Sequence, residues 1–229
     1  MNKWLKPDPD FKKYLQSAKP RLVDKLTPDT TISFDKCDIP DESDFISIPN
    51  SNRKIMKGYL SLNGETIVNT NYVQFHDLIK EMNLVTKKQF RMPYFAEAVN
   101  TYYNSKNEDF KKTFQNKAEW LDEIVSIDEQ WIMRSPANAR FVEDEFKYDG
   151  TKEKMKIAKE DGYFKKVNAY GYPETIQSDK PKNNPLYLWQ NNNTNPVLRC
   201  WASAGGCPDA SVNRAASLSA SDLSARLVS

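Results

Sequence analysis

The sequence predicts an α+β domain with two central helices and short antiparallel strands, and three observations predict it. A β-hairpin is indicated by Asn63-Gly64 between two apolar runs, because this dipeptide accepts the positive backbone angles of a type I′ turn. Residues 72–82 and 91–103 carry apolar side chains at helical spacing, which indicates two amphipathic helices. Short apolar runs bounded by turn residues lie before and after these segments, and they are typical of strands.

The ends of these elements have local reasons. The alternating run of residues 45–48 stops at Pro49, so it predicts a short strand. Thr70 or Asn71 can cap the first helix with a side-chain oxygen. Pro93 suits the first turn of the second helix, because its missing N–H costs nothing there.

The rest of the domain is predicted more coarsely. Residues 110–121 favour a helical or irregular cover, and residues 124–127 with 131–133 favour a strand pair. Residues 147–166 interleave Lys with acidic residues, which indicates a solvated helix or a mobile excursion. Short strands are expected at residues 186–189 and 196–199, followed by a last strand at residues 223–228.

The chain divides into an N-terminal extension and one domain. Residues 1–45 mix charge with five prolines, which break long helices, and leave one short helix at residues 11–18. Residues 46–229 form the domain, which is long enough to bury a core.

Net charge and hydropathy exclude several classes of partner. The 33 basic residues nearly balance the 31 acidic ones, for a net charge of +2, so no strong field draws in nucleic acid. No run approaches the roughly 20 apolar residues of a membrane span, and the N-terminus lacks the apolar core of a signal peptide. The expectation is a cytoplasmic protein with no nucleic-acid partner and no membrane span.

No catalytic, metal or cofactor site is predicted, and the chain is not expected to be an enzyme. His76 is the only histidine, and its neighbour Asp77 cannot face it on a helix. The acidic residues 41–44 and 143–145 lack the regular oxygen spacing of a calcium loop. The 7 glycines include no phosphate-cradling loop,.

The three cysteines do not indicate a zinc site either. Cys37, Cys200 and Cys207 have no familiar metal-ligand spacing,. Buried free thiols are the expectation. A Cys200–Cys207 bridge remains open if the protein enters an oxidising compartment.

The composition of the chain changes abruptly near its end. The last Lys is Lys182 and the last Glu is Glu174, whereas residues 199–229 are mostly Ala, Ser, Val and small polar residues. A body rich in Lys, Asn and Glu therefore ends in a segment of different character.

Three motifs resemble one branch of a known fold. Residues 90–98, Phe-Arg-Met-Pro-Tyr-Phe-Ala-Glu-Ala, resemble the Arg-Leu-Pro-Thr-Glu-x-Glu-Trp helix opening of the formylglycine-generating-enzyme-like branch of the C-type lectin fold. Residues 197–203 resemble its Val-Leu-Arg-Gly-Gly-Ser-Trp strand, with Cys200 where Gly is usual. Residues 223–228 resemble its closing strand, Ile/Leu-Gly-Phe/Val-Arg-Leu-Val. The resemblance implies a C-type-lectin-like fold over about residues 45–229.

Within that branch the chain resembles the variable proteins of diversity-generating retroelements. Mutagenic copying at adenines in that subgroup would deplete Lys codons, which fits residues 199–229. The resemblance implies a ligand-binding protein whose changeable surface lies in residues 199–223 and whose ligand is a protein or another surface-exposed macromolecule. The implied ligand-binding residues are Trp201, Ser203, Asp209, Ser211, Asn213, Arg214, Leu218, Ala220 and Asp222, and the implied framework residues are Arg199, Leu223, Arg226 and Val228.

Two other hypotheses remain open at this point. One is a copper-dependent oxidase of the same fold, for which Cys200 and Cys207 are the available pair. The other is a non-catalytic interaction protein whose tail arose by a frameshift or by fusion, which predicts a disordered tail.

Overall fold

The computed structural model describes residues 37–229 except 69, 117, 144, 184, 190–196, 205–206 and 215–222. Clustering of contacts separates Met1–Ile32 from Ser33–Ser229, and every described residue belongs to the second unit. The helix expected at residues 11–18 lies outside the described residues. Within the described part, no helix is long and apolar enough to cross a membrane.

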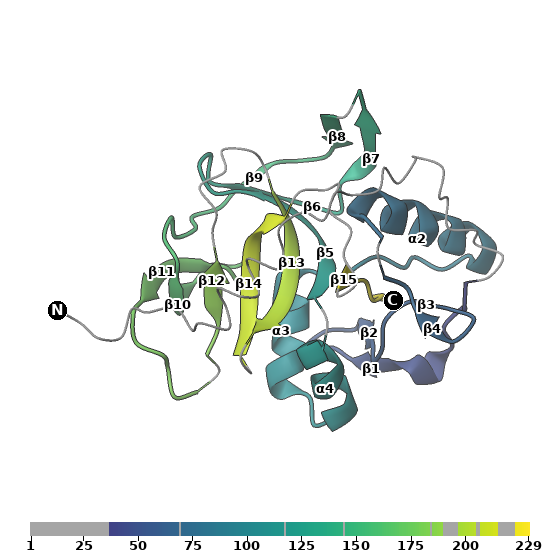
Figure 1. Ribbon diagram of the computed structural model, residues 1–229, viewed down its shortest axis with the longest axis horizontal. Helices are drawn as coiled ribbons and strands as arrows, with labels where there is room; N and C mark the ends of the chain where they lie inside the picture. The colour runs from purple at the N-terminus through teal and green to yellow at the C-terminus, as the bar shows by residue number, and fades with distance from the viewer. Residues whose placement is uncertain are drawn as a thin grey trace, which may run out of the picture. The chain divides into compact units, whose positions relative to one another are not determined.

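Strands dominate the described chain, and the prediction of an α+β domain is confirmed (Figure 1). The helical elements are η2 (Glu42–Asp44), α2 (Tyr72–Thr86), α3 (Phe95–Asn104) and α4 (Glu108–Asn116). The strands are β1 (Phe45–Ser47), β2 (Lys54–Met56), β3 (Ser61–Leu62), β4 (Glu65–Thr66), β5 (Ala118–Ser126), β6 (Trp131–Arg134), β7 (Ala137–Val142), β8 (Glu145–Asp149), β9 (Glu153–Lys154), β10 (Gly162–Val167), β11 (Pro173–Gln177), β12 (Tyr187–Trp189), β13 (Val197–Ala204), β14 (Cys207–Arg214) and β15 (Leu223–Ser224).

The first elements form as their local sequence predicts. β1 pairs with β2, and β3 pairs with β4 in the expected hairpin. Asn63 and Gly64 between β3 and β4 have φ of 51° and 80°, as a type I′ turn requires. The sequence before β1 also belongs to this unit, because Asp38 donates its N–H to Ser61 O at 3.0 Å.

Helix α2 begins where a cap was expected. Asn71 is the N-cap: its side chain accepts from Gln74 N at 3.0 Å, and the Gln74 side chain accepts from Asn71 N at 3.0 Å. This reciprocal pair satisfies two backbone donors at the helix start. The apolar face predicted for this helix is buried, and its members are Tyr72, Phe75, Leu78, Ile79 and Met82.

Helix α3 starts later than the sequence predicted. Its first residue is Phe95, so Pro93 precedes the helix and does not occupy its first turn. The reason is that residues 91–93 run extended beside other strands: Arg91 pairs with Val228, and Pro93 O accepts from Asp122 N at 2.9 Å. Glu97 then accepts from Tyr94 N at 2.8 Å and closes the helix start.

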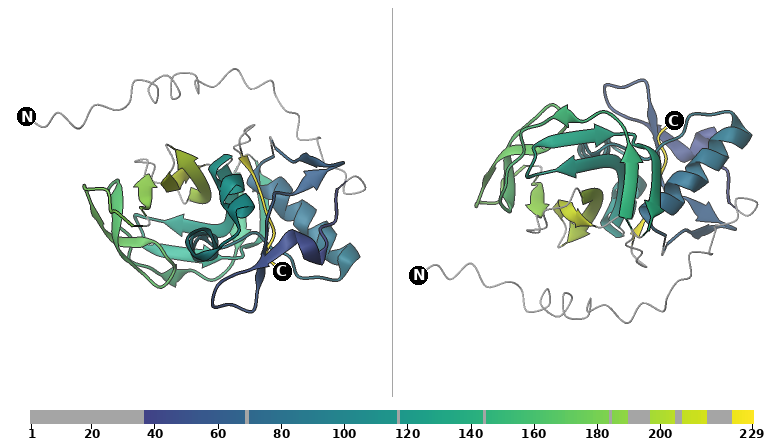
Figure 2. Two further views of the ribbon diagram at one scale, coloured as in Figure 1. Left: turned by 90° about the horizontal axis from the view of Figure 1, so that it is seen from below. Right: turned by 90° about the horizontal axis from the view of Figure 1, so that it is seen from above.

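The main sheet has nine strands in the order β11-β10-β12-β14-β13-β5-β6-β9, with β15 paired to β5 off this path. Its pairs are antiparallel except β12 with β14 and β15 with β5. The predicted strand pair is β5 with β6, which align Ile124 with Met133. In Figures 1 and 2 the C-terminal residues lie beside β2, and the bridge between Ile55 and Val228 records this contact.

Two segments differ from the sequence-based expectation. Trp120 and Leu121 lie in β5 and not in a covering helix. Residues 147–166 contain parts of three strands, β8, β9 and β10, instead of a solvated helix. Here Met155 and Ile157 are 3% exposed, so a segment that reads as polar supplies two side chains to the core.

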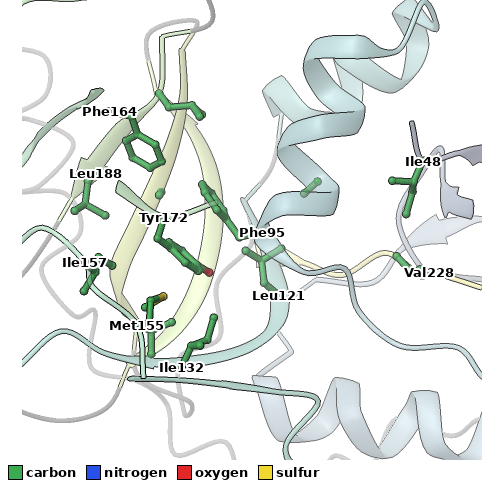
Figure 3. Packing of buried hydrophobic residues seen from close by; sticks show 14 of the residues in the cluster. Ile48, Phe95, Leu121, Ile132, Met155, Ile157, Phe164, Tyr172, Leu188 and Val228 are labelled. Carbon is green, nitrogen blue, oxygen red and sulfur yellow. The ribbon is translucent and has the colours of Figure 1, made fainter. Parts of the chain in front are cut away.

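The hydrophobic core joins elements from the whole domain (Figure 3). Phe95 of α3 stacks on Tyr172 with ring centroids 4.6 Å apart, and Leu121 of β5 and Leu188 of β12 are fully buried. Val228, the penultimate residue, belongs to the same cluster. The C-terminal end of the chain is therefore part of the core.

The N-cap of α2 gives a stability prediction. Asn71→Ala removes an acceptor from the first turn and should lower the free energy of unfolding by about 0.5–2 kcal/mol. Asn71→Asp keeps a capping oxygen and should cost less, as measured by urea denaturation. A loss for Asn71→Asp as large as that for Asn71→Ala would contradict the capping role.

Candidate functional site

The residues implied in ligand binding fall largely on one hairpin, β13–β14. Trp201 and Ser203 lie on β13, and Asp209, Ser211, Asn213 and Arg214 lie on β14. Leu218, Ala220 and Asp222 lie outside the described residues. In the ladder Trp201 is opposite Ala210, and Ser203 is opposite Pro208. The fold thus brings together six of the nine positions in neighbouring backbone segments.

The hairpin is fixed on both sides. β14 pairs with β12, and β13 pairs with β5, so neither strand is an edge of the main sheet. Ala210, in the middle of β14, is 1% exposed and belongs to the hydrophobic core. The backbone that carries the implied site is therefore part of the scaffold.

The chain returns to the core after the hairpin. Ser224 donates its hydroxyl to Ile67 O at 2.7 Å, and Leu227 O accepts from Met56 N at 2.8 Å. Val228 and Arg91 exchange backbone hydrogen bonds of 2.8 and 3.2 Å. Residues 224–228 are all buried, and they include Arg226 and Val228, two of the residues implied as framework.

Arg226 and Glu119 form a fully buried ion pair, with both side chains 0% exposed. Nη1 of Arg226 also donates to the carbonyl oxygens of Met56 and Lys57, each at 3.1 Å. The guanidinium lies 4.5 Å from the ring centroid of Tyr59. Burial raises the pKa of Glu119, and the positive charge of Arg226 offsets only part of this effect,.

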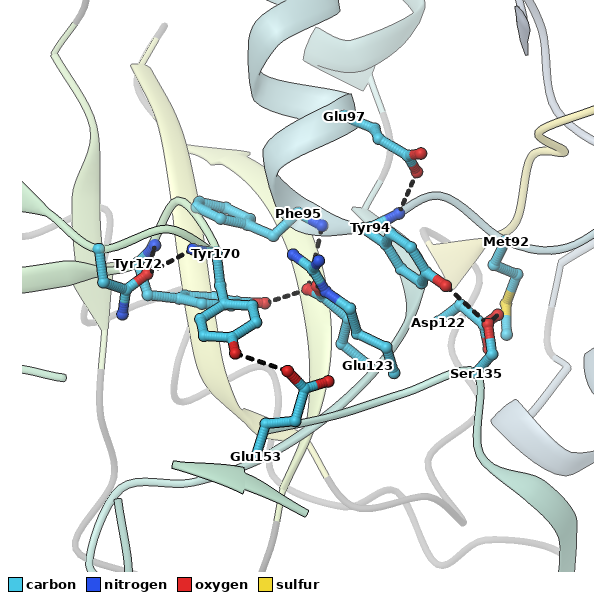
Figure 4. A network of polar contacts seen from close by, with 12 residues as sticks. Met92, Tyr94, Phe95, Glu97, Asp122, Glu123, Ser135, Glu153, Tyr170 and Tyr172 are labelled. Carbon is cyan, nitrogen blue, oxygen red and sulfur yellow. Dashed lines mark hydrogen bonds and ion pairs between the residues drawn. The ribbon is translucent and has the colours of Figure 1, made fainter. Parts of the chain in front are cut away.

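Glu119 is one of three buried acids on β5, a strand whose nine residues are all buried. Glu123 accepts from Arg134 Nε at 3.0 Å, from Phe95 N at 3.0 Å and from the Tyr172 hydroxyl (Figure 4). The pKa of Glu123 is raised, because the effect of burial exceeds the opposing effects of Arg134 and of the Tyr172 and Phe95 donors. Glu123 therefore ties the start of α3 to β6 and to the segment before β11.

Asp122, the third acid, lies at a different kind of site. Its Oδ2 accepts from the Ser135 hydroxyl at 2.8 Å, and Ser135 Oγ lies 2.9 Å from the Tyr94 hydroxyl (Figure 4). His76 Nε2 lies 3.1 Å from Asp122 Oδ1. The carboxylate thus stands between Ser135 and His76, whereas a nucleophilic triad needs the imidazole between the other two groups.

The sequence did not identify Asp122 and Ser135. Asp122 and Glu123 interrupt an otherwise apolar run at residues 120–125. Acidic residues within such a run are the signal in the sequence that could have indicated buried carboxylates. Ser135 follows β6 with φ of 45°, a backbone angle that the sequence does not reveal. Tyr72, whose hydroxyl is buried near these acids, has a pKa raised by burial first and then by the charges of Asp122 and Glu123.

The cysteines are separated in the fold. Burial raises the pKa of Cys37 to about 11. Cys207 of β14 lies opposite Ala204 of β13 in the ladder. Ala204 is four residues after Cys200 on the same strand, so the two cysteines are about 13 Å apart along the strand direction. A disulfide needs Cα atoms within about 7 Å, so this register does not allow a Cys200–Cys207 bridge. Within the described residues, no group of three His, Cys, Asp or Glu side chains is placed to hold a metal ion.

Comparison of the chain with protein-family models, with curated proteins and with solved structures finds no match.

The buried ion pair gives a prediction with a pH dependence. Arg226→Met leaves Glu119 buried without its cation and should lower the free energy of unfolding by about 3–5 kcal/mol near pH 7. The folded-state pKa of Glu119 is raised, so its protonated form contributes stability at low pH that is lost as the pH rises through that pKa,. Removing Arg226 raises the pKa of Glu119 further, so Glu119 is more often protonated and uncharged near pH 4. The loss of unfolding free energy in Arg226→Met should therefore be smaller near pH 4 than near pH 7, as measured by urea denaturation.

Two variants control this experiment. Arg53→Met removes a guanidinium from an exposed residue and should change stability by no more than about 0.5 kcal/mol. Combining Glu119→Gln with Arg226→Met removes both charges and should restore part of the loss. Equal losses for Arg226→Met and Arg53→Met would show that the ion pair is not needed for stability.

Proposed function

We propose that this protein binds a macromolecular ligand through a changeable C-terminal surface on a C-type-lectin-like scaffold of the formylglycine-generating-enzyme-like branch. The observation that carries the proposal is the anchoring of the C-terminal segment at both ends. The β13–β14 hairpin lies inside the main sheet. After the hairpin, Arg226 is buried in the core, where it pairs with Glu119. Side chains between such anchors can change at little cost to the core.

The binding positions follow the backbone of this segment. Ala210 is buried, and successive positions of a strand alternate between its two faces. Strand periodicity therefore assigns positions 209 and 211 to the face opposite Ala210, which is the face proposed for the ligand. Arg214 is the proposed anchor, because Arg side chains are enriched in binding hot spots. Trp201 lies opposite Ala210 in the ladder, so the same periodicity assigns it to the face of Ala210.

The change in composition supports diversification of this segment. A folded body supplies the scaffold, whereas residues 199–229 contain neither Lys nor Glu. Mutagenic replacement at adenines would remove Lys codons and introduce Ala, Ser and Asp. A frame-shifted or fused tail would have no reason to end in residues that complete the core, and Ser224, Ala225 and Arg226 are each 0% exposed.

A copper-dependent oxidase is the weaker alternative. It requires Cys200 and Cys207 on one metal ion, and the ladder separates them by about 13 Å along β13,. Under the binding proposal, both thiols keep their reactivity toward a thiol reagent when copper is added. Protection of both thiols by one equivalent of copper would support the oxidase.

Substitution tolerance tests the division between scaffold and changeable positions. Ala210→Asp places a charge in the core and should unfold the domain or cost several kcal/mol. Ser211→Asp introduces the same residue at the next position and should cost no more than about 0.5 kcal/mol. A protease-resistance screen of single substitutions should show the same contrast between residues 224–228 and the proposed binding positions. Equal intolerance at both sets would contradict the proposal.

The coding DNA tests diversification itself. We expect a near-copy of the segment that encodes residues 199–229 close to the coding sequence, with differences mainly at adenines, beside a gene for a reverse transcriptase. If no such copy is present, the diversification proposal fails, and the tolerance experiment still decides whether the segment is a surface on a scaffold.

A further inference from the structure

A cleft of about 520 Å³ lies between helix α2 and the segment that joins β6 to β7. Asp122 and Ser135 line it together with His76 of α2. Much of the remaining wall is apolar, and these residues are Ile79, Leu84, Phe90, Met92, Pro136 and Ala137. Most of the other lining residues are polar or charged, among them Asp77, Lys80 and Asn83, so the cleft combines an apolar wall with groups that can orient a small molecule.

Buried polar atoms without a hydrogen-bond partner line this cleft. The Asp122 side chain is 2% exposed, and its Oδ1 has no hydrogen bond. His76 Nε2 lies 3.1 Å from this oxygen, and it too has no hydrogen bond. An imidazole nitrogen without a proton accepts a hydrogen bond, as a carboxylate oxygen does, so one donor between the two atoms could satisfy both.

The nearby cations of the protein are engaged elsewhere. Arg91 binds both carboxylate oxygens of Glu97 at 2.6 and 2.8 Å. Arg134 binds Glu123 at 3.0 Å. Lys80, which also lines the cleft, is exposed to solvent. The hydrogen bonds of Arg91 and Arg134 thus go to Glu97 and Glu123, and Asp122 accepts from the Ser135 hydroxyl.

We propose that this cleft binds a small organic cation, a primary amine attached to an apolar body. The ammonium group donates to Asp122 Oδ1 and to His76 Nε2, and its charge neutralises the buried carboxylate. The apolar body lies against the wall that contains Leu84 and Phe90. An anion would be repelled by Asp122, and a neutral hydrocarbon would leave Oδ1 without a donor.

The test uses benzylamine as the probe and the full-length chain. Isothermal titration calorimetry measures affinity, and amide NMR shifts of residues 137–139 locate the bound probe. Benzyl alcohol and benzoate have the same ring without the positive charge, so each should bind at least about tenfold more weakly, since hydrogen bonds to charged groups are the stronger class. Equal binding of benzylamine and benzyl alcohol would overturn the proposal.

Matched variants assign the interaction to Asp122. Asp122→Asn keeps the shape and removes the charge, and it should weaken benzylamine binding at least about tenfold. Asp77→Asn makes the same change at an exposed residue of the same cleft and should change affinity less than about twofold. Equal effects of the two substitutions would show a general electrostatic attraction and would overturn the assignment.

A third variant keeps the proposal testable if Asp122→Asn fails to fold. Ala137→Trp fills the cleft from an exposed position and should abolish benzylamine binding without unfolding the protein. Unchanged binding to Ala137→Trp would place the probe elsewhere. The ¹⁵N shifts of His76 in the free protein provide one more check, because a protonated Nε2 bonded to Asp122 would satisfy the carboxylate internally and overturn the proposal.

Discussion

The burial of three carboxylates on one strand constrains the rest of this structure. All nine residues of β5 are buried, so Glu119, Asp122 and Glu123 must find partners inside the protein. Glu119 pairs with Arg226 near the C-terminal end of the chain. Glu123 accepts hydrogen bonds from Arg134, from the Tyr172 hydroxyl and from the backbone N–H of Phe95. Each partner comes from a different part of the chain. The strand therefore determines which distant segments must meet before the domain is complete.

We expect such pairs to contribute more to specificity than to net stability. Removing two charges from water costs about as much as their attraction returns, so a buried ion pair is weak evidence of a large stabilisation. Its effect is to penalise any fold in which the partner is absent. Arg226 lies 107 residues after Glu119 in the sequence, so the core is incomplete until the C-terminal residues have docked.

Local signals predicted the elements whose causes are local. The Asn63-Gly64 turn, the Asn71 cap and the apolar face of α2 depend on residues within a few positions of one another. The first part of β5, before residue 124, could not be predicted in the same way, because burial of both faces removes the alternation that marks a strand. The core positions Met155 and Ile157 were hidden because the Lys and Glu residues around them indicated solvent. The hairpin positions of the candidate site follow from register, which depends on pairing with β5 and β12.

The three acids of β5 differ in how completely their carboxylates are satisfied. Glu119 and Glu123 are neutralised by Arg226 and Arg134, and those interactions explain why they are tolerated in the core. Asp122 has a hydroxyl partner and an imidazole that does not align with its second oxygen. An incompletely satisfied carboxylate is a cost that folding alone does not explain, and such groups are concentrated at functional sites. Asp122 also lines the cleft that opens beside α2, and the proposed cation would supply the donor that its second oxygen lacks.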